Sequence, residues 1–320
     1  MESRGFLQHT AVSALSLGGG GIGQVWGPTT RAEAVSTVIE AANCGINWID
    51  VAPSYGDGEA ESVIAEAFKG TVPNGVRIST KCKLVTGASI SFAVRLHTSI
   101  QGSLERMHLN SVALLILHNM ITEPSTPSEA GCTSADYQEN VIPALIGLKQ
   151  EGIVAAWGIT GIGVPSAISK AISEVPKPDA IQIVTNALDS AGDIQGYQGA
   201  FTPRLTIEEA NSNDVAVMGI RAVQGGALTS SFDRLVDESS ADMMDYIRAT
   251  DFRQLCQYLD IKPAVLAHRY ALSLNGVATI VIGVKNRYEL YECLEAEEKG
   301  KLDDELISLV DQSIDGREST

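Results

Sequence analysis

The 320-residue sequence is poor in cysteine, in basic residues and in long apolar runs, and each shortage excludes a class of protein. Its five cysteines are scattered and form no CxxC pair, which argues against a disulfide framework or zinc site and favours a reducing cytoplasm. The 23 basic residues face 39 acidic ones, a net charge of −16, so neither nucleic acid nor an anionic membrane is an expected partner. No signal-peptide-like segment begins the sequence, and the run VALLIL at 112–117 is too short to span a bilayer. We therefore predict a soluble cytoplasmic protein.

The sequence does contain a regular alternation of short apolar runs and amphipathic stretches. Eight runs have the length and composition of strands, at 14–19, 46–51, 77–82, 111–117, 155–160, 180–185, 215–220 and 278–283. Helical patterns separate them, at 29–45, 58–70, 88–108, 138–151, 165–174, 205–213, 250–274 and 287–298. Residues 5–11 predict a short hairpin before the first strand.

Strands that alternate with helices favour one closed barrel. Such strands pair in parallel through right-handed crossovers, and their consecutive apolar residues suit a sheet that is buried on both faces. We predict an α/β fold, a (β/α)8 TIM barrel in which residues 1–320 form one domain. The long connections near 119–138 and 221–250 follow strands and are expected to carry part of the site, because barrel active sites lie at the carboxyl ends.

Two motifs resemble parts of a Rossmann-type short-chain dehydrogenase. The glycines at 18–23 satisfy GxGxxG, but the next helix is expected only near Thr30, too late for its amino terminus to face a pyrophosphate. Tyr258 and Lys262 have the YxxxK spacing, but Pro263 follows and the glycines lie about 240 residues away. We interpret the glycines as a tight loop and Tyr258–Lys262 as solvated surface.

Four ionisable residues stand at or just beyond the carboxyl ends of consecutive predicted strands. Asp50 ends one strand and Tyr55 follows it, Lys81 ends the next strand, and His118 directly follows the third. Each has an ordinary structural explanation by itself, such as an Asp that caps a turn or a Lys that is solvated. In a barrel, however, these strand ends meet at one mouth, so we expect the four side chains to lie together.

These four side chains fit one chemistry, the protonation of a carbonyl oxygen as a hydride reaches the carbon. A tyrosine hydroxyl has an ordinary pKa of about 10, and a nearby ammonium favours its phenolate form. Asp50 would hold Lys81 and offset the cost of burying its charge, and His118 would donate a hydrogen bond to the carbonyl oxygen. The set contains no nucleophile with an oriented base, so it predicts an oxidoreductase.

At these residues the sequence resembles the aldo-keto reductase superfamily. Similar stretches are GINWIDVAPSYGDGEAESVIAEAF, ISTKCK, LERMHLNSVALLILHN and LKQEGIVAAWGIT, and the similarity continues through IQIVTNALD to VATIVIGVKNRYELYECL. It therefore covers nearly the whole chain. The resemblance implies a barrel that binds a nicotinamide dinucleotide without a Rossmann fold. It also places the family's catalytic residues at Asp50, Tyr55, Lys81 and His118.

The resemblance also implies a cofactor site. Gln182 matches a glutamine that binds the nicotinamide carboxamide, whereas the family's Ser-Asn pair is Thr160-Gly161 here. Ile220-Arg221 stands where the family has a stacking aromatic residue and a serine, so Arg221 is expected near the pyrophosphate. The other residues expected to bind the cofactor are Gly19, Gly20, Asp50, Gly283, Lys285, Asn286, Arg287 and Glu292.

The residues after the eighth strand bear on the choice of cofactor. Lys285 and Arg287 lie at the start of a helix with free N–H groups and resemble the family's site for the 2′-phosphate of NADP. NADP(H) is therefore favoured over NAD(H), although Glu289 would repel a phosphate. With Lys81 and Arg221, the two residues form a predicted basic track along one face.

The sequence thus predicts an NADP-dependent aldo-keto reductase (EC 1.1.1.-) that reduces an aldehyde or ketone, or oxidises a sugar-type alcohol in reverse. Trp26, Tyr55 and His118 are expected to contact this small-molecule substrate. Two alternatives stay open: a non-catalytic nicotinamide-binding redox-sensor subunit on the same barrel, and a Rossmann-type short-chain dehydrogenase. The residues identify neither the substrate, the physiological direction nor the oligomeric state.

Overall fold

A computed structural model describes residues 1–7, 10–83, 91–123, 131–197 and 199–315. Eight parallel strands form a closed barrel, and the last of them pairs with the first. In barrel order the strands are β3 Leu15–Gly18, β4 Trp48–Asp50, β5 Arg77–Cys82, β6 Val112–Leu117, β9 Val154–Thr160, β10 Ala180–Val184, β11 Ala216–Ile220 and β12 Val277–Ile282. The predicted (β/α)8 barrel is confirmed, and the doubly wound sheet of a Rossmann-type dehydrogenase is excluded.

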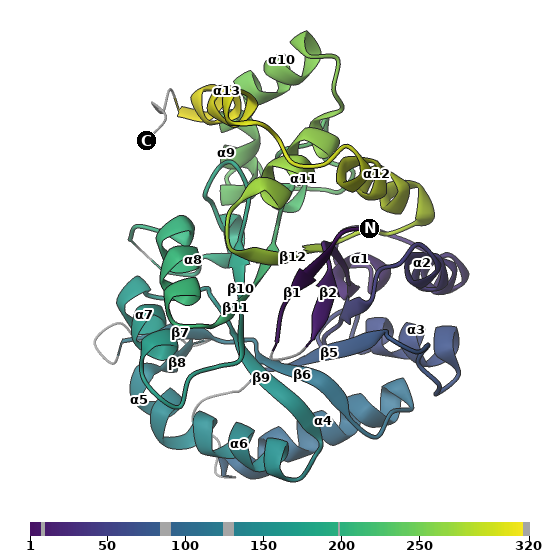
Figure 1. Cartoon of the computed structure of the whole chain (residues 1–320), viewed down its shortest axis with the longest axis vertical. Helices are drawn as coiled ribbons and strands as arrows, with labels where there is room; N and C mark the ends of the chain where they lie inside the picture. The colour runs from purple at the N-terminus through teal and green to yellow at the C-terminus, as the bar shows by residue number, and fades with distance from the viewer. Residues whose placement is uncertain (8–9, 84–90, 124–130, 198, 316–320) are drawn as a thin grey trace.

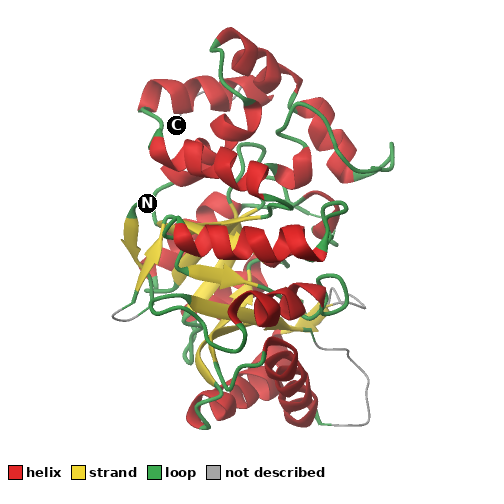
Figure 2. Ribbon diagram, turned by 90° about the vertical axis from the view of Figure 1, so that its right-hand side faces the viewer, coloured by secondary structure: helices red, strands yellow, loops and turns green. Residues whose placement is uncertain are grey.

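Helices surround the barrel in Figure 1, and Figure 2 shows the strands gathered between helices above and below. The α-helices are α1 Gly19–Ile22, α2 Arg31–Asn43, α3 Glu59–Phe68, α4 Phe92–Met107, α5 Ser134–Asp136, α6 Ile142–Gln150, α7 Pro165–Ser173, α8 Pro203–Ser212, α9 Ala241–Arg248, α10 Thr250–Tyr258, α11 Pro263–Ser273, α12 Arg287–Glu298 and α13 Asp304–Asp315. Three short turns are the π-helix η1 Tyr137–Val141 and the 3-10 helices η2 Gly192–Ile194 and η3 Gln224–Gly226.

Three expectations about helices need correction. The helix predicted at 250–274 is divided into α10 and α11, because Pro263 has no N–H to continue a helix and instead begins α11. A four-residue helix, α1, directly follows β3, where no helix was expected before Thr30. The helices α5, α9 and α13 were not predicted. The start of the helix predicted at 88–108 lies outside the described residues.

An amino-terminal hairpin covers one end of the barrel. Its strands, β1 Ser3–Gly5 and β2 Ala11–Ser13, are antiparallel and flank the predicted hairpin region, of which residues 8–9 lie outside the described chain. Phe6 packs edge-to-face on the fully buried Trp48 at the start of β4, with ring centroids 5.0 Å apart. Because the hairpin covers the amino ends of the strands, a ligand must enter at their carboxyl ends.

The two long connections contain short elements of their own. In the first, β7 Met120–Thr122 pairs with β8 Gly131–Thr133, and residues 124–130 lie outside the described chain. The second contains η3 and α9. Within the described ranges, no helix combines the length and apolar character needed to cross a bilayer.

Candidate active site

A cavity of about 760 Å³ opens at the carboxyl ends of the barrel strands, since Gly18, Asp50, Thr160, Ile220 and Ile282 all line it. Most residues that the sequence predicted for the site are in its wall: Gly19, Gly20, Trp26, Asp50, Tyr55, His118, Thr160, Gln182, Arg221, Gly283, Lys285 and Glu292. Lys81, Asn286 and Arg287 do not line it.

Asp50 and Lys81 form a buried ion pair beneath the cavity. Lys81 Nζ lies 2.5 Å from Asp50 Oδ2 and 3.1 Å from the carbonyl oxygen of Val51. Asp50 also accepts hydrogen bonds from Ser79 Oγ at 2.7 Å and Gln182 Nε2 at 2.9 Å. Burial opposes the charge of Lys81, but Asp50 and Tyr55 outweigh it and raise the Lys81 pKa, so the ammonium is retained.

Tyr55 and His118 lie above this ion pair. Lys81 Nζ is 4.8 Å from the centroid of the Tyr55 ring, and the His118 ring meets the Tyr55 ring edge-to-face with centroids 5.9 Å apart. Burial, aided by the charges of Lys81 and Lys83, lowers the pKa of His118 from 6.5 to about 3. The imidazole is therefore neutral near neutral pH. The structure thus brings Asp50, Tyr55, Lys81 and His118 together, as their places on successive strands predicted.

Two local features position these side chains. The Tyr55 loop between β4 and α3 turns through Gly56 and Gly58, whose φ angles of 64° and 88° favour glycine. The backbone N–H of His118 donates to the carbonyl oxygen of Cys82 at 2.8 Å, which ties it to the end of β5. The rigid barrel strands therefore hold three of the residues, and a tight loop presents Tyr55.

Thr160 and Gln182 are neighbours on β9 and β10. Gln182 donates to Asp50, so its side chain is anchored to the ion pair as well as facing the cavity. Thr160 lines the same wall, and its buried Oγ1 has no hydrogen-bond partner in the described part of the chain. An unpaired hydroxyl beside an anchored amide suits a ligand with a carboxamide, as the nicotinamide group has.

Trp26 lies against the glycines of the cavity wall. A Cβ atom would come within 2.5 Å of Trp26 Nε1 at Gly20 and within 2.8 Å at Gly283, so the indole needs glycine at both positions. Two guanidinium groups also lie near the tryptophan ring, with Arg221 Cζ 5.7 Å and Arg234 Cζ 5.9 Å from its centroid. Packing of Trp26 thus explains these glycines in addition to any approach of a ligand.

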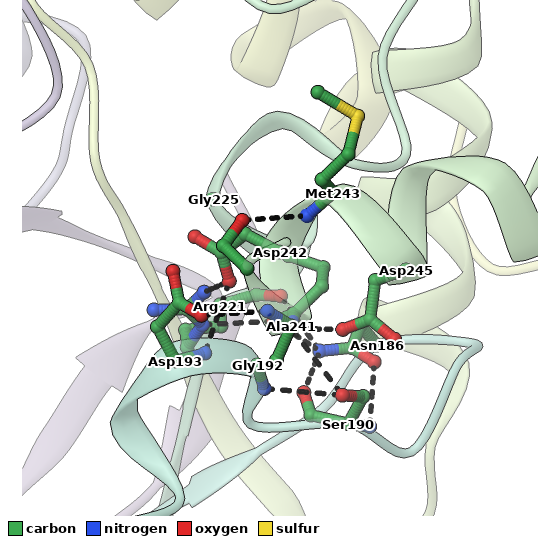
Figure 3. A network of polar contacts seen from close by, with 12 residues as sticks. Asn186, Ser190, Gly192, Asp193, Arg221, Gly225, Ala241, Asp242, Met243 and Asp245 are labelled. Atoms are coloured by element: carbon green, nitrogen blue, oxygen red, sulfur yellow. Dashed lines mark hydrogen bonds and ion pairs between the residues drawn. The ribbon is translucent and has the colours of Figure 1, made fainter. Parts of the chain in front are cut away.

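Arg221 belongs to the buried polar network of Figure 3. Its Nη2 lies 2.7 Å from Asp242 Oδ1 and its Nε donates to Gln224 Oε1 at 2.8 Å, while Asp242 also binds Arg234 at 2.8 Å. Burial lowers the pKa of Arg221, and the charge of Asp242 offsets only part of that effect. Arg221 reaches the cavity wall with its charge already paired.

The predicted basic track is not a run of free positive charge. Lys81 pairs with Asp50, Arg221 with Asp242, Lys285 with Asp233 and Glu289, and Arg287 with Glu33. Most of these carboxylates come from distant parts of the chain. The sequence pointed to Asp50 and Glu289, but it did not reveal Asp233, Asp242 or Glu33.

Sequence reasoning missed residues at the far end of the cavity. Lys262, His268 and Cys293 line it there, with Cys293 Sγ 3.5 Å from His268 Nε2. Lys262 pairs with Glu292 at 2.9 Å, whereas Tyr258 is 85% exposed at the end of α10, so the YxxxK spacing forms no site on one helix. These residues could have been suspected because they belong to the two helices that flank the eighth strand, at whose end the cofactor site was expected.

One known protein resembles this chain along nearly all of its length, and another resembles about a quarter of it. It is 27% identical over 312 residues to an L-galactose dehydrogenase of Arabidopsis thaliana, which covers 95% of this chain and 91% of that protein. An NADH-specific methylglyoxal reductase of Escherichia coli (strain K12) is 35% identical over 80 residues, which span 25% of this chain and 24% of that protein.

Solved structures share the fold. An aldo-keto reductase from Bacillus halodurans, AKR11C1 in its holo form, gives a TM-score of 0.73 at 20% identity over 100% of this chain and 98% of that chain. The glycerol dehydrogenase AKR11B4 from Gluconobacter oxydans gives a TM-score of 0.73 at 20% identity, covering 99% and 97%. The model of the aldo/keto reductase family matches residues 14–315. This chain is therefore a member of the aldo/keto reductase family, an oxidoreductase built on a closed β/α barrel.

Proposed function

We propose that this chain interconverts a carbonyl compound and its alcohol with a nicotinamide dinucleotide bound along the cavity. The observation that carries the proposal is the cluster of Tyr55 and His118 over the buried Lys81–Asp50 pair. The unpaired Thr160 hydroxyl supports a bound carboxamide. When bound, the nicotinamide supplies or accepts the hydride. Thr160 and Gln182 would hold it.

The protein side chains would donate the proton and bind the substrate oxygen. Tyr55 donates its hydroxyl proton to the developing alkoxide, and the Lys81 ammonium beside the ring stabilises the phenolate left behind. Asp50 keeps Lys81 charged and in place. His118 is neutral, so one ring N–H can donate to the substrate oxygen without competing for the proton. In the alcohol-oxidising direction, the same groups act in reverse.

A sugar or polyol is the substrate class that the relatives favour. The relative from Arabidopsis thaliana carries the name L-galactose dehydrogenase, and that sequence match covers most of both chains. We propose an aldose-type alcohol or the corresponding carbonyl compound as substrate, with Trp26 as part of the pocket wall. We also propose a cytoplasmic location, because all five cysteines are free thiols.

Tyr55→Phe tests the proposed proton donor. The variant should lose about 10²–10⁴-fold in kcat, the usual contribution of a general acid, while its dinucleotide affinity stays near that of wild type. The measurement is turnover with a panel of aldoses, glycerol and methylglyoxal, together with calorimetric titration of the dinucleotide. Tyr258→Phe is the matched control, because Tyr258 is 85% exposed and should keep full activity.

Two outcomes would contradict the proposal. Near-wild-type turnover by Tyr55→Phe would remove Tyr55 from the chemistry. Dinucleotide binding without single-turnover oxidation of the reduced form by any carbonyl compound would instead support the non-catalytic redox-sensor alternative.

A further inference from the structure

We propose that Glu33 and Glu289 exclude a 2′-phosphate from the start of α12, so that the chain prefers NAD(H) to NADP(H). The inference rests on the proposed function, since it concerns the adenosine end of the same dinucleotide. It reverses the preference for NADP(H) that the family resemblance implies for Lys285 and Arg287. The reason is that the hydrogen-bond donors around these two residues already have carboxylate partners.

Glu289 occupies the donors inside the cavity. Its Oε2 accepts from the backbone N–H of Lys285 at 2.8 Å, and its Oε1 lies 2.7 Å from Lys285 Nζ. Its own N–H donates at 3.0 Å to Oδ1 of Asn286, the residue that caps the amino end of α12. A phosphate at this place would have to displace a carboxylate that already uses both donor groups of Lys285.

Glu33 occupies the donors just outside the cavity. This residue comes from α2, and its Oε1 accepts from the Arg287 backbone N–H at 3.0 Å and from Arg287 Nε at 3.1 Å. Its Oε2 lies 3.0 Å from Arg287 Nη2. The hydrogen bonds from Arg287 lower the pKa of Glu33, so the carboxylate stays ionised at neutral pH. Arg287 is thus held by a bidentate pair that leaves a phosphate little to bind.

The local charge also opposes a phosphate. Lys285 contacts a further carboxylate, Asp233, so two cations face three carboxylates around the start of α12. A phosphate monoester adds about −1.5 to −2 charges at neutral pH. A ribose 2′-hydroxyl, in contrast, is a neutral donor that a carboxylate such as Glu289 accepts well, as acidic residues do in NAD-binding folds.

Calorimetric titration without substrate tests the inference directly. Wild-type protein should bind NADH at least about tenfold more tightly than NADPH, a difference of about 1.4 kcal/mol. It should likewise bind 5′-AMP more tightly than adenosine 2′,5′-bisphosphate. In the double variant Glu33→Gln/Glu289→Gln, the preference for NADH, measured as the ratio of the NADPH to the NADH dissociation constant, should fall about tenfold. Its circular dichroism should match that of wild type.

Glu40→Gln is the matched control. Glu40 also links α2 to α12, through a 2.8 Å hydrogen bond from Tyr291 Oη, but it accepts from Tyr291 and Cys44 rather than from Lys285 or Arg287. Its loss should therefore leave the ratio of the two affinities unchanged. The inference would be wrong if wild-type protein bound NADPH as tightly as NADH. It would also be wrong if the folded double variant kept the wild-type ratio of the two affinities. Either result would leave the proposed function unaffected. If neither dinucleotide binds to wild-type protein, both proposals fail.

Discussion

At the scale of single residues, the site depends on the Asp50 carboxylate, which accepts hydrogen bonds from three side chains. Asp50 is 2% exposed and accepts from Lys81, Ser79 and Gln182 at once. A buried carboxylate with three donors is well compensated, whereas removing it would leave the Lys81 ammonium without a partner. The same compact cluster keeps His118 neutral, because burial and the ammonium both disfavour its protonation.

The lowered pKa of His118 predicts weaker stability in acid. The unfolded histidine binds a proton near 6.5 and the folded one only near 3, so between these values the unfolded state holds more protons. The free energy of unfolding should therefore fall by up to about 1.4 kcal/mol per pH unit as pH drops from 6.5. Urea titrations between pH 4 and pH 7 should show a shallower pH slope for His118→Gln than for wild type.

His97→Gln serves as the control for this measurement. The His97 side chain lies at the surface, 47% exposed, so its replacement shows whether loss of any histidine changes the slope. If His118→Gln and wild type had the same slope, the neutral state assigned to His118 would be wrong.

At the scale of elements, α9 is attached to the barrel mainly by polar contacts. Asp242 in its first turn binds Arg221 and Arg234, and Asp245 accepts from Gln224, as Figure 3 shows in part. These contacts join α9 to the loop after β11, and so to the wall of the cavity, while the Ala241 N–H donates at 2.8 Å to Asp193 Oδ1 in the loop after β10. The helix α13 combines polar and apolar contacts: Asp311 accepts from Arg204 at 2.9 Å and from Tyr270 at 2.6 Å, while Val310 and Ile314 are buried in an apolar cluster.

Asp242→Asn tests the contribution of the α9 network. The change leaves the buried guanidinium of Arg221 without its carboxylate, and loss of one partner of a buried ion pair costs about 3–5 kcal/mol. Urea unfolding followed by circular dichroism should show a loss near the lower end of that range. Asp251→Asn, at an exposed position in the first turn of α10, should cost less than about 1 kcal/mol. Equal losses would mean that the network does not stabilise the fold.

At the scale of the whole molecule, the barrel depends on the meeting of its first and last strands. β12 pairs with β3, and Ser16 and Thr279 share a buried hydrogen bond of 2.7 Å inside this contact. Just beyond the strand ends, Gly21 in α1 lies against Val284, where a Cβ atom would come 2.0 Å from the carbonyl oxygen. Closure therefore requires glycine at this position.

Gly21→Ala should weaken barrel closure. The added methyl group must push Val284 away from β3, and such overpacking costs about 1–3 kcal/mol. Gly147→Ala is the control, because its Cβ atom in α6 would meet nothing within 4 Å and should stabilise the protein by about 0.5–1 kcal/mol. Urea unfolding of the two variants should therefore shift in opposite directions. A shift of both in the same direction would contradict the role assigned to Gly21.

Local sequence patterns were enough to predict the barrel and the central cluster of its site. Strand and helix periods depend on local apolar spacing, and strand ends in a parallel barrel must meet, so Asp50, Tyr55, Lys81 and His118 could be placed together from their positions alone. Pro263 also indicated the break between α10 and α11, although the continuous apolar spacing over 250–274 led to the prediction of a single helix.

Which basic side chains are paired depends on contacts between distant segments of the chain, and these contacts could not be predicted. Glu33 pairs with Arg287, which lies 254 positions later in the sequence. Asp242 in α9 pairs with Arg221 in the loop after β11. Ion pairs between distant segments leave no periodic pattern, because they depend on how the packed helices approach one another rather than on local spacing. The basic residues that suggested a phosphate site in the sequence are for this reason neutralised in the folded chain.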